Sequence, residues 1–254
     1  MEIIETLRIR SGLMYGFGLI NLVTAFLLIV LSFLKPVEFG GTNAWHKPIK
    51  FTLSTAILSW SLAWYLGYLP GGRDIDITNW VIVITLGFEV VYIVWQAAKG
   101  EASHFNSSTP FHSAMFSMMA LAATIATLAI GYLGLKFLGE TVQELPDYYL
   151  WAIRLGFLLF VIFSFEGFVM GSNMAHSVGG PDGSSGIPFL NWSLSYGDLR
   201  IAHFIGMHAL QVLPFLAWYF LKEVNLTIGS FILYGLLAIF VLVQALQGKS
   251  IVTL

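Results

Sequence analysis

The chain has 254 residues, of which 57% are hydrophobic and only 10% are charged, and its mean hydropathy is +0.80. A soluble domain carries about 25% charged residues, so this composition excludes an ordinary water-soluble protein and predicts a membrane protein. The net charge of −2 gives no indication of a nucleic-acid partner, and the absence of cysteine excludes disulfides and thiolate metal sites.

Apolar runs separated by Gly- and Pro-containing breaks occupy most of the chain. A helix needs roughly 20 apolar residues to cross a bilayer, and only helices and closed barrels satisfy the backbone in lipid. Because the runs do not alternate as barrel strands do, the sequence predicts an all-α fold, a polytopic transmembrane helix bundle that forms one domain over residues 1–254. The predicted spans, about seven, are 12–34, 49–70, 77–98, 112–138, 148–174, 199–221 and 226–247.

The first span is too long for the apolar part of a cleavable signal peptide, so we expect it to remain in the protein. Lysine and arginine divide almost evenly between the two sides, which leaves the membrane orientation open under the positive-inside rule. The lipid bilayer is the expected environment, and the oligomeric state is open. With seven spans, the first, third and fifth connections share one face of the membrane.

Five of the six histidines fall at or next to these odd-numbered connections, and the sixth is deeper in the sixth span. Histidine is the commonest metal ligand and the side chain that titrates near neutral pH. One interpretation is a metal site at this face; the other is that interfacial histidines merely tolerate a half-polar zone. The candidate ligands are His46, His104, His112, His176, His203 and His208.

Three ionisable groups are predicted near the bilayer centre. Glu89, Glu166 and His208 each lie eight to ten residues below the histidine-rich end of a span, which at 1.5 Å per residue is roughly 12–15 Å. A charge there costs at least roughly 2.5 kcal/mol, so such residues face inward, pair or become neutral. The two glutamates are the candidate catalytic acids or bases, and the alternative role is hydrogen bonding between helices.

Several polar residues extend these positions into stripes. Gln96 and Asn173 each follow a buried glutamate by seven residues, and Gln211 follows His208 by three, so each shares a helix face with its partner. The three are candidate cofactor-binding residues. Lys47, Lys50 and Arg200 flank the histidines and are candidates for holding an anionic group such as a haem propionate, a lipid phosphate or a fatty carboxylate, or else they are snorkelling anchors.

The fifth connection, 175–198, is the longest, and a loop of this length is either a functional lid or an ordinary surface loop. Its last residue, Asp198, suits the N-cap of the sixth span. Pro214 would free a backbone carbonyl in that span and favour a kink.

The segments 45–51, 102–106, 197–204 and 208–211 resemble those of an uncharacterised bacterial family of multi-pass membrane proteins, over most of the chain. The resemblance implies the bacterial inner (cytoplasmic) membrane but brings no activity with it. The ceramidase-like and progestin-receptor-like zinc enzymes carry a pair of histidines four apart on a late helix. Here His203 and His208 are five apart, so one regular helix does not readily aim both at one zinc ion.

Three functions are therefore open. The first is a metal- or haem-binding membrane redox protein or metalloenzyme, with haem or a divalent zinc, iron or copper ion as cofactor. The second is a proton- or cation-coupled transporter or channel that uses the layer of Glu89, Glu166 and His208. The third is a sensor or binding protein without catalysis, with a small-molecule or lipid ligand. Whether the protein is an enzyme is open.

Overall fold

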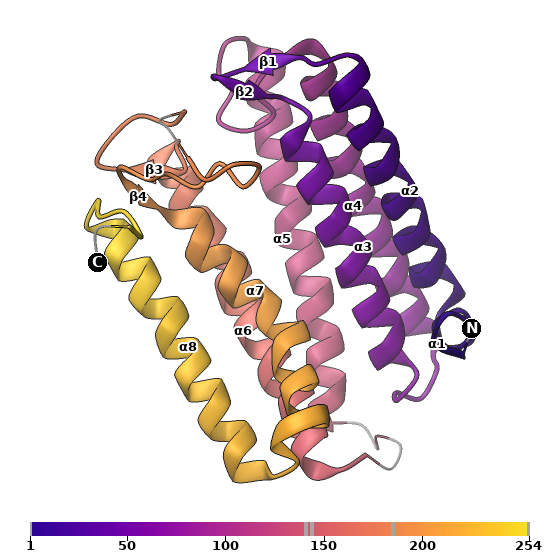
Figure 1. The fold of residues 1–254 in the computed structure, drawn as a ribbon. Helices are drawn as coiled ribbons and strands as arrows, with labels where there is room; N and C mark the ends of the chain where they lie inside the picture. Colours follow the sequence, from indigo (N-terminus) through magenta and orange to yellow (C-terminus); the bar gives the residue numbers. More distant parts are fainter. Residues whose placement is uncertain (1, 140–141, 143–144, 184–185, 253–254) are drawn as a thin grey trace. The chain divides into compact units, whose positions relative to one another are not determined.

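The computed structural model describes residues 2–139, 142, 145–183 and 186–252, and these residues form mainly long helices (Figure 1). The helices are α1 (Glu2–Arg10), α2 (Gly12–Leu34), α3 (His46–Leu66), α4 (Arg73–Lys99), α5 (Pro110–Gly139), α6 (Asp147–Asn173), α7 (Leu199–Leu216), the π-helix η1 (Ala217–Leu221) and α8 (Val224–Leu246). The all-α prediction is confirmed, and every predicted span corresponds to a helix whose ends differ by a few residues at most.

Six of the described helices are long and apolar enough to cross a membrane: α2, α4, α5, α6, α7 with η1, and α8. This indicates an integral membrane protein. The seventh long helix, α3, is less apolar because Thr52, Thr55 and Ser59 line its buried face. The Thr52 and Ser59 hydroxyls donate to carbonyls four residues earlier, so their polar atoms are satisfied within the helix. Six crossings are thus supported, and the seventh stays a prediction.

The chain divides into two compact units, Met1–Ala129 and Ile130–Leu254, and the boundary falls within α5. In the first unit, α3 packs along α2 and α4, and Leu28, Trp45, Ile49 and Ala97 form one part of its core. The prediction of one domain is not tested by this division.

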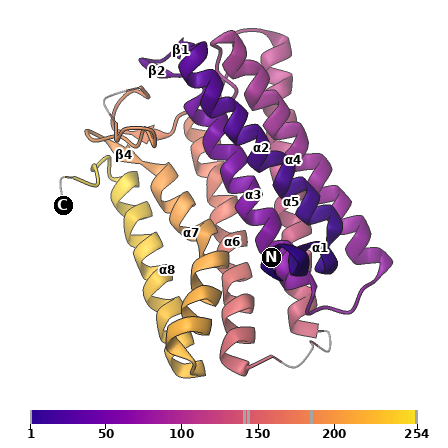
Figure 2. The same ribbon diagram turned by 45° about the vertical axis from the view of Figure 1, so that its right-hand side comes forward.

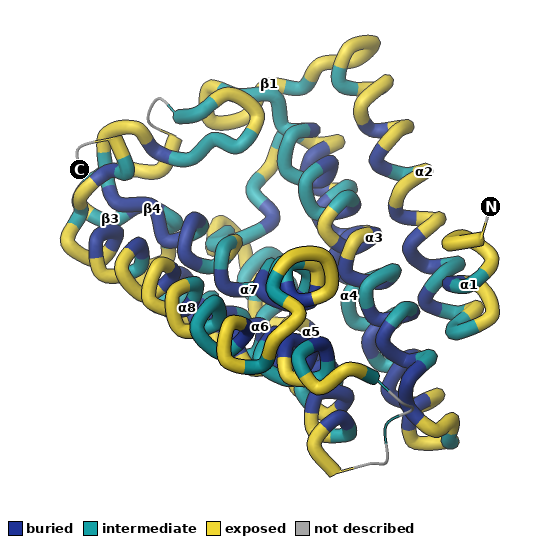
Figure 3. Tube along the Cα trace, turned by 60° about the horizontal axis from the view of Figure 1, so that its bottom comes forward, coloured by how far each residue is buried: buried dark blue, intermediate teal, exposed yellow. Residues whose placement is uncertain are grey.

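In the second unit, α6, α7 and α8 pack on one another around a core rich in alanine (Figure 2). Small side chains let helix backbones approach closely, which is how membrane helices gain packing contacts. Leu233, Leu237 and Phe240 of α8 are large, apolar and exposed, as lipid-facing residues are. Figure 3 shows exposed stretches along α8 in yellow. Each helix therefore has a tightly packed face and an apolar outer face.

Two short antiparallel hairpin pairings close the connections at one end of each unit. β1 (Glu38–Phe39) pairs with β2 (Thr42–Asn43), and β3 (Ser177–Val178) pairs with β4 (Gly197–Asp198), with Ser177 opposite Asp198. The second pairing joins the two ends of the fifth connection, so this long segment begins and ends at one place beside α7.

At Pro214, where the sequence predicts a kink, the structure has a π-helix after the proline. α7 continues through the proline and then widens into η1, where the Ala217 N–H donates to the carbonyls of Leu213 and Pro214. Trp218 of η1 packs edge-on against Tyr149 of α6, with ring centroids 5.0 Å apart.

Gly197 lies where β4 meets the end of α8. A Cβ atom at Gly197 would lie 2.0 Å from the backbone oxygen of Ala245, so no side chain fits there without moving the backbone. We expect Gly197→Ala to destabilise the protein by roughly 1–3 kcal/mol, the usual cost of overpacking. Thermal unfolding in detergent, followed by tryptophan fluorescence, measures the loss. The matched control is Gly229→Ala, since nothing lies within 4 Å of that position on α8; equal stability of the two variants would contradict the prediction.

Candidate functional site

The first unit buries a polar face of α4. Glu89 is 8% exposed, Tyr92 is 3% exposed and Gln96 is fully buried, and their spacing of three, four and seven residues puts them on one side of the helix. This confirms that the stripe of Glu89 and Gln96 faces inward. The Gln96 side-chain amide donates to the carbonyl of Ala102 at 3.0 Å, so the stripe also fixes the third connection.

His112, at the start of α5, lies against this stripe. Its Nδ1 is 3.3 Å from Nε2 of Gln96 and 3.5 Å from the Tyr92 hydroxyl, and its Nε2 is 3.6 Å from a carboxylate oxygen of Glu101. Because an amide nitrogen only donates, Nδ1 of His112 accepts and its proton is on Nε2, toward Glu101. Gln96 thereby sets the tautomer of His112.

His104 of the third connection meets Lys47 of α3. The Lys47 ammonium lies 3.1 Å from Nδ1 of His104, and the Ser103 hydroxyl lies at the same distance. A charged lysine only donates, so the contact suits Nδ1 of His104 as the acceptor. The contact confirms, within Met1–Ala129, that the first and third connections share an end.

The Lys47 charge also acts on the Glu89 carboxyl. Lys47 thus has two neighbours: it contacts His104 of the third connection, and its charge lies within electrostatic range of the buried Glu89. Beside them, His46 begins α3; burial lowers the pKa of its imidazole and the charge of Lys50 lowers it further, so His46 is neutral at neutral pH.

The second unit pairs Glu166 of α6 with His203 of α7. A Glu166 carboxylate oxygen lies 3.3 Å from Nδ1 of His203, and the Glu166 side chain is 4% exposed whereas that of His203 is 29% exposed. Within the described residues, neither oxygen of Glu166 has a hydrogen-bond partner. Gly167 leaves room for the imidazole, because a Cβ atom there would lie 3.3 Å from Cε1 of His203.

Glu166 thus pairs with His203 rather than with His208, the residue predicted in its layer. Nδ1 of His208 lies 2.8 Å from the carbonyl oxygen of Phe204, four residues earlier. The His208 and Phe204 rings pack together with their centroids 4.0 Å apart. The side chains of His203 and His208 point in different directions, as their spacing of five residues predicts. His203, which is nearer to the start of α7, faces the Glu166 carboxylate.

Several predicted site residues instead hold the fifth connection together. Asp198 is the N-cap of α7, as predicted, and accepts from the Arg200 backbone N–H. The Arg200 guanidinium is bidentate to the same carboxylate, at 2.9 and 2.6 Å, and also donates to the carbonyl of Asn191. Asn173 donates to the carbonyls of Ala175 and Ser177. These contacts are structural; cofactor binding by Arg200, Asn173, Lys50 and the half-buried Gln211 stays a prediction.

His176 and Asp182 clamp the same connection. The Asp182 carboxylate accepts from Nδ1 of His176 at 2.7 Å and from the backbone N–H groups of His176 and Ser177. Burial raises the pKa of the Asp182 carboxyl. The hydrogen bonds from His176, the charge of its imidazole and the hydrogen bond from the Ser177 amide have a larger, opposite effect, so the pKa lies well below its usual range. Sequence analysis missed Asp182 because nothing in the spacing marks it as a partner of His176.

The predicted metal centre is not supported. Among the described residues, no group of three or more His, Asp or Glu side chains is arranged to hold a metal ion. Haem needs only one or two histidine ligands, so haem binding stays a prediction. Four of the histidines instead lie next to a charged side chain of the protein. The neighbour is Lys47 for His104, Glu101 for His112, Asp182 for His176 and Glu166 for His203.

The contacts of Asp182 with His176 and Ser177 should depend on whether the Asp182 carboxyl is ionised. A carboxyl whose pKa is lowered on folding stabilises the fold above its ordinary pKa of 3.8, and this contribution is lost as the pH falls through the lower folded value. We therefore expect Asp182→Asn to speed amide hydrogen exchange at His176 and Ser177 at neutral pH. The difference in exchange rate from the wild type should shrink only when the pH falls below the ordinary carboxyl pKa of 3.8. The control is Asp147→Asn, at the exposed start of α6; unchanged exchange in Asp182→Asn would refute the clamp.

Comparison of the chain with protein-family models, with curated proteins and with solved structures finds no match. The resemblance to a bacterial membrane-protein family, and with it the bacterial inner membrane, therefore stays a prediction.

Proposed function

We propose that the protein translocates protons across the membrane and that the Glu166–His203 pair is the site that takes up and releases them. The observation that carries the proposal is a carboxylate buried between two candidate membrane spans, with both oxygens unbonded among the described residues and an imidazole nitrogen 3.3 Å away. Ionisable residues inside membrane helices are costly and commonly form proton relays of Asp, Glu and His.

The pair can hold one proton in two ways. With the proton on His203, the site holds a carboxylate and an imidazolium in contact; with the proton on Glu166, both groups are neutral and no charge is buried. The two atoms are 3.3 Å apart but are not aligned as a hydrogen bond among the described residues, so the transfer needs a small rotation of the His203 ring or the Glu166 carboxyl. Because the His203 side chain is seven times more exposed than that of Glu166, at 29% against 4%, it is the end of the pair that exchanges protons with the outside.

The first unit supports the proposal with a second series of the same kind. Glu89 is buried on a candidate span and, within the described residues, its Oε1 has no hydrogen-bond partner. Lys47 acts on it electrostatically and contacts His104 at 3.1 Å. Each unit therefore contains one buried glutamate with a basic side chain between it and the helix end, and each glutamate has the role of a proton acceptor within the bilayer.

The metal hypothesis is left without a specific observation in its favour, since the described donors are not grouped around one point; haem binding, which needs only one or two histidine ligands, stays a prediction. For a non-catalytic sensor, a ligand site built on the histidines has little support, because four of these side chains lie against other groups of the protein.

Proton uptake by proteoliposomes tests the proposal. Vesicles that contain the purified protein and a trapped pH-sensitive dye are given a potassium diffusion potential, which drives protons inward. We expect Glu166→Gln to abolish the protein-dependent flux, because the amide cannot take up a proton, and His203→Ala to lower it by about tenfold or more, the usual contribution of a positioned proton-transfer group being roughly 10²–10⁴-fold.

The matched control is Glu223→Gln, the same substitution at an exposed position just before α8, which should leave the flux unchanged. Infrared difference spectra between acid and neutral pH should show a carboxyl band in the wild type that is missing in Glu166→Gln. Absence of flux in the wild type, or full flux in Glu166→Gln, would overturn the proposal. An absorption spectrum with metal analysis of the same preparation would show haem or bound metal if the alternative hypothesis holds.

A further inference from the structure

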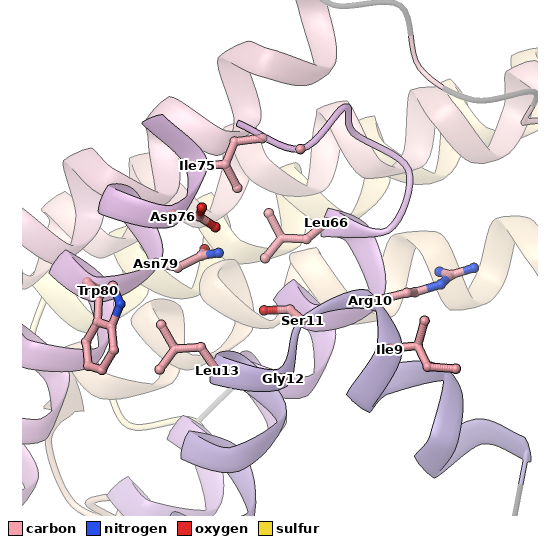
Figure 4. A pocket seen from close by; sticks show the side chains of 11 residues that line it. Ile9, Arg10, Ser11, Gly12, Leu13, Leu66, Ile75, Asp76, Asn79 and Trp80 are labelled. Carbon is pink, nitrogen blue, oxygen red and sulfur yellow. The ribbon is translucent and has the colours of Figure 1, made fainter. Parts of the chain in front are cut away.

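A cavity of about 430 Å³ lies within the first unit, at the end remote from His104, where α1 meets α2 and where α3 passes into α4 (Figure 4). This volume falls in the range of roughly 300–1,000 Å³ that small-molecule sites occupy. Its apolar walls are Ile9, Leu13, Leu66 and Ile75. Its polar and interfacial lining consists of Arg10, Ser11, Asp76, Asn79 and Trp80.

The α4 wall of the cavity presents hydrogen-bond acceptors. Asp76 and Asn79 lie three residues apart on α4, and Figure 4 shows their side chains next to each other. Asn79 is 5% exposed, and its Oδ1 has no hydrogen-bond partner among the described residues. A buried acceptor without a partner is costly, and a carboxylate accepts only. This wall therefore suits a group that carries both a positive charge and N–H donors.

The opposite wall is positive. Arg10 is held in place because its guanidinium donates to the carbonyl of Trp64 at 2.7 Å and stacks over the rings of Trp64 and Tyr68, at 4.1 and 4.3 Å. Ser11 and Gly12 begin α2 on the same wall, and the start of a helix carries a partial positive charge that favours phosphate. The cavity lining thus combines an arginine and the start of a helix on one side with a carboxylate and an amide on the other.

The cavity lies at the boundary between the apolar and polar parts of the unit. α2 and α4 are candidate membrane spans and both begin at the cavity. α1 is a short helix set at a steep angle to α2 (Figure 1), and Ile3, Ile4 and Ile9 on it are exposed, a pattern typical of a helix in the membrane interface. Trp80 at the cavity is 55% exposed, as interfacial tryptophans are.

We infer that this cavity binds the aminoethyl phosphate headgroup of a phospholipid, with the phosphate at Arg10 and the start of α2 and the primary ammonium between Asp76 and Asn79. Phosphatidylethanolamine satisfies both ends. Phosphatidylcholine matches its charges but lacks N–H donors for the Asn79 oxygen, and phosphatidylglycerol lacks a cation to place beside Asp76. The site is independent of the proton site proposed in the second unit.

Native mass spectrometry of the delipidated protein in detergent tests this inference, with each of the three lipids added separately. We expect phosphatidylethanolamine to be retained roughly tenfold more strongly than phosphatidylcholine, since a hydrogen bond to a charged group is worth about one factor of ten or more. Asp76→Asn and Asn79→Leu should each reduce this preference to near equality.

The matched control is Asp74→Asn, which alters an acidic residue in the same first turn of α4 that does not line the cavity, and should keep the preference. Thermal unfolding of each variant checks that it is folded. Soluble phosphoethanolamine forms a separate arm: displacement of the lipid at matched concentration would identify the headgroup alone as the ligand. Equal retention of all three lipids by the wild type, or an unchanged preference in both Asp76→Asn and Asn79→Leu, would overturn the inference.

Discussion

The cost of holding a carboxylate inside an apolar helix bundle governs the chemistry of this protein. Glu89 and Glu166 lie on candidate membrane spans, where a lone charge is expensive. Both are placed within the influence of a basic side chain, Lys47 in one case and His203 in the other. The neighbouring groups fit this arrangement: Lys47 also contacts His104, and Gly167 makes room for the imidazole beside Glu166.

The sequence was sufficient to predict the seven long helices, because a run of about 20 apolar residues is what a bilayer-crossing helix requires. It was also sufficient for the inward direction of the Glu89 and Gln96 stripe, since helix periodicity fixes which residues share a face. Depth along a span was a poorer guide to partners. Glu166 was matched in depth to His208, but the rotation of α7 about its own axis decides the pairing and selects His203. That rotation depends on packing, which periodicity does not encode.

The positions of the histidines in the sequence likewise predict only part of their contacts. Their one-sided placement correctly brings Lys47 and His104 together, yet it gives no information on how many imidazoles meet at one point. The cavity beside Asn79 was missed altogether, because α1 was not predicted as a helix and its steep angle to α2 creates one wall. The acceptors Asp76 and Asn79, three apart at the start of a span, were the signal available in the sequence.

The π-turn after Pro214 also has a geometric effect on the residues that follow. A π-turn holds about one residue more than an α-turn, and one residue corresponds to roughly 100° of rotation around a helix. The aromatic segment Trp218, Tyr219 and Phe220 is therefore presented on a different side of α7 from the one that regular helical continuation would give. Trp218 packs against Tyr149 of α6 in this orientation, so the bulge adjusts the register of one helix between its packing at the Glu166–His203 pair and its aromatic packing near Tyr149.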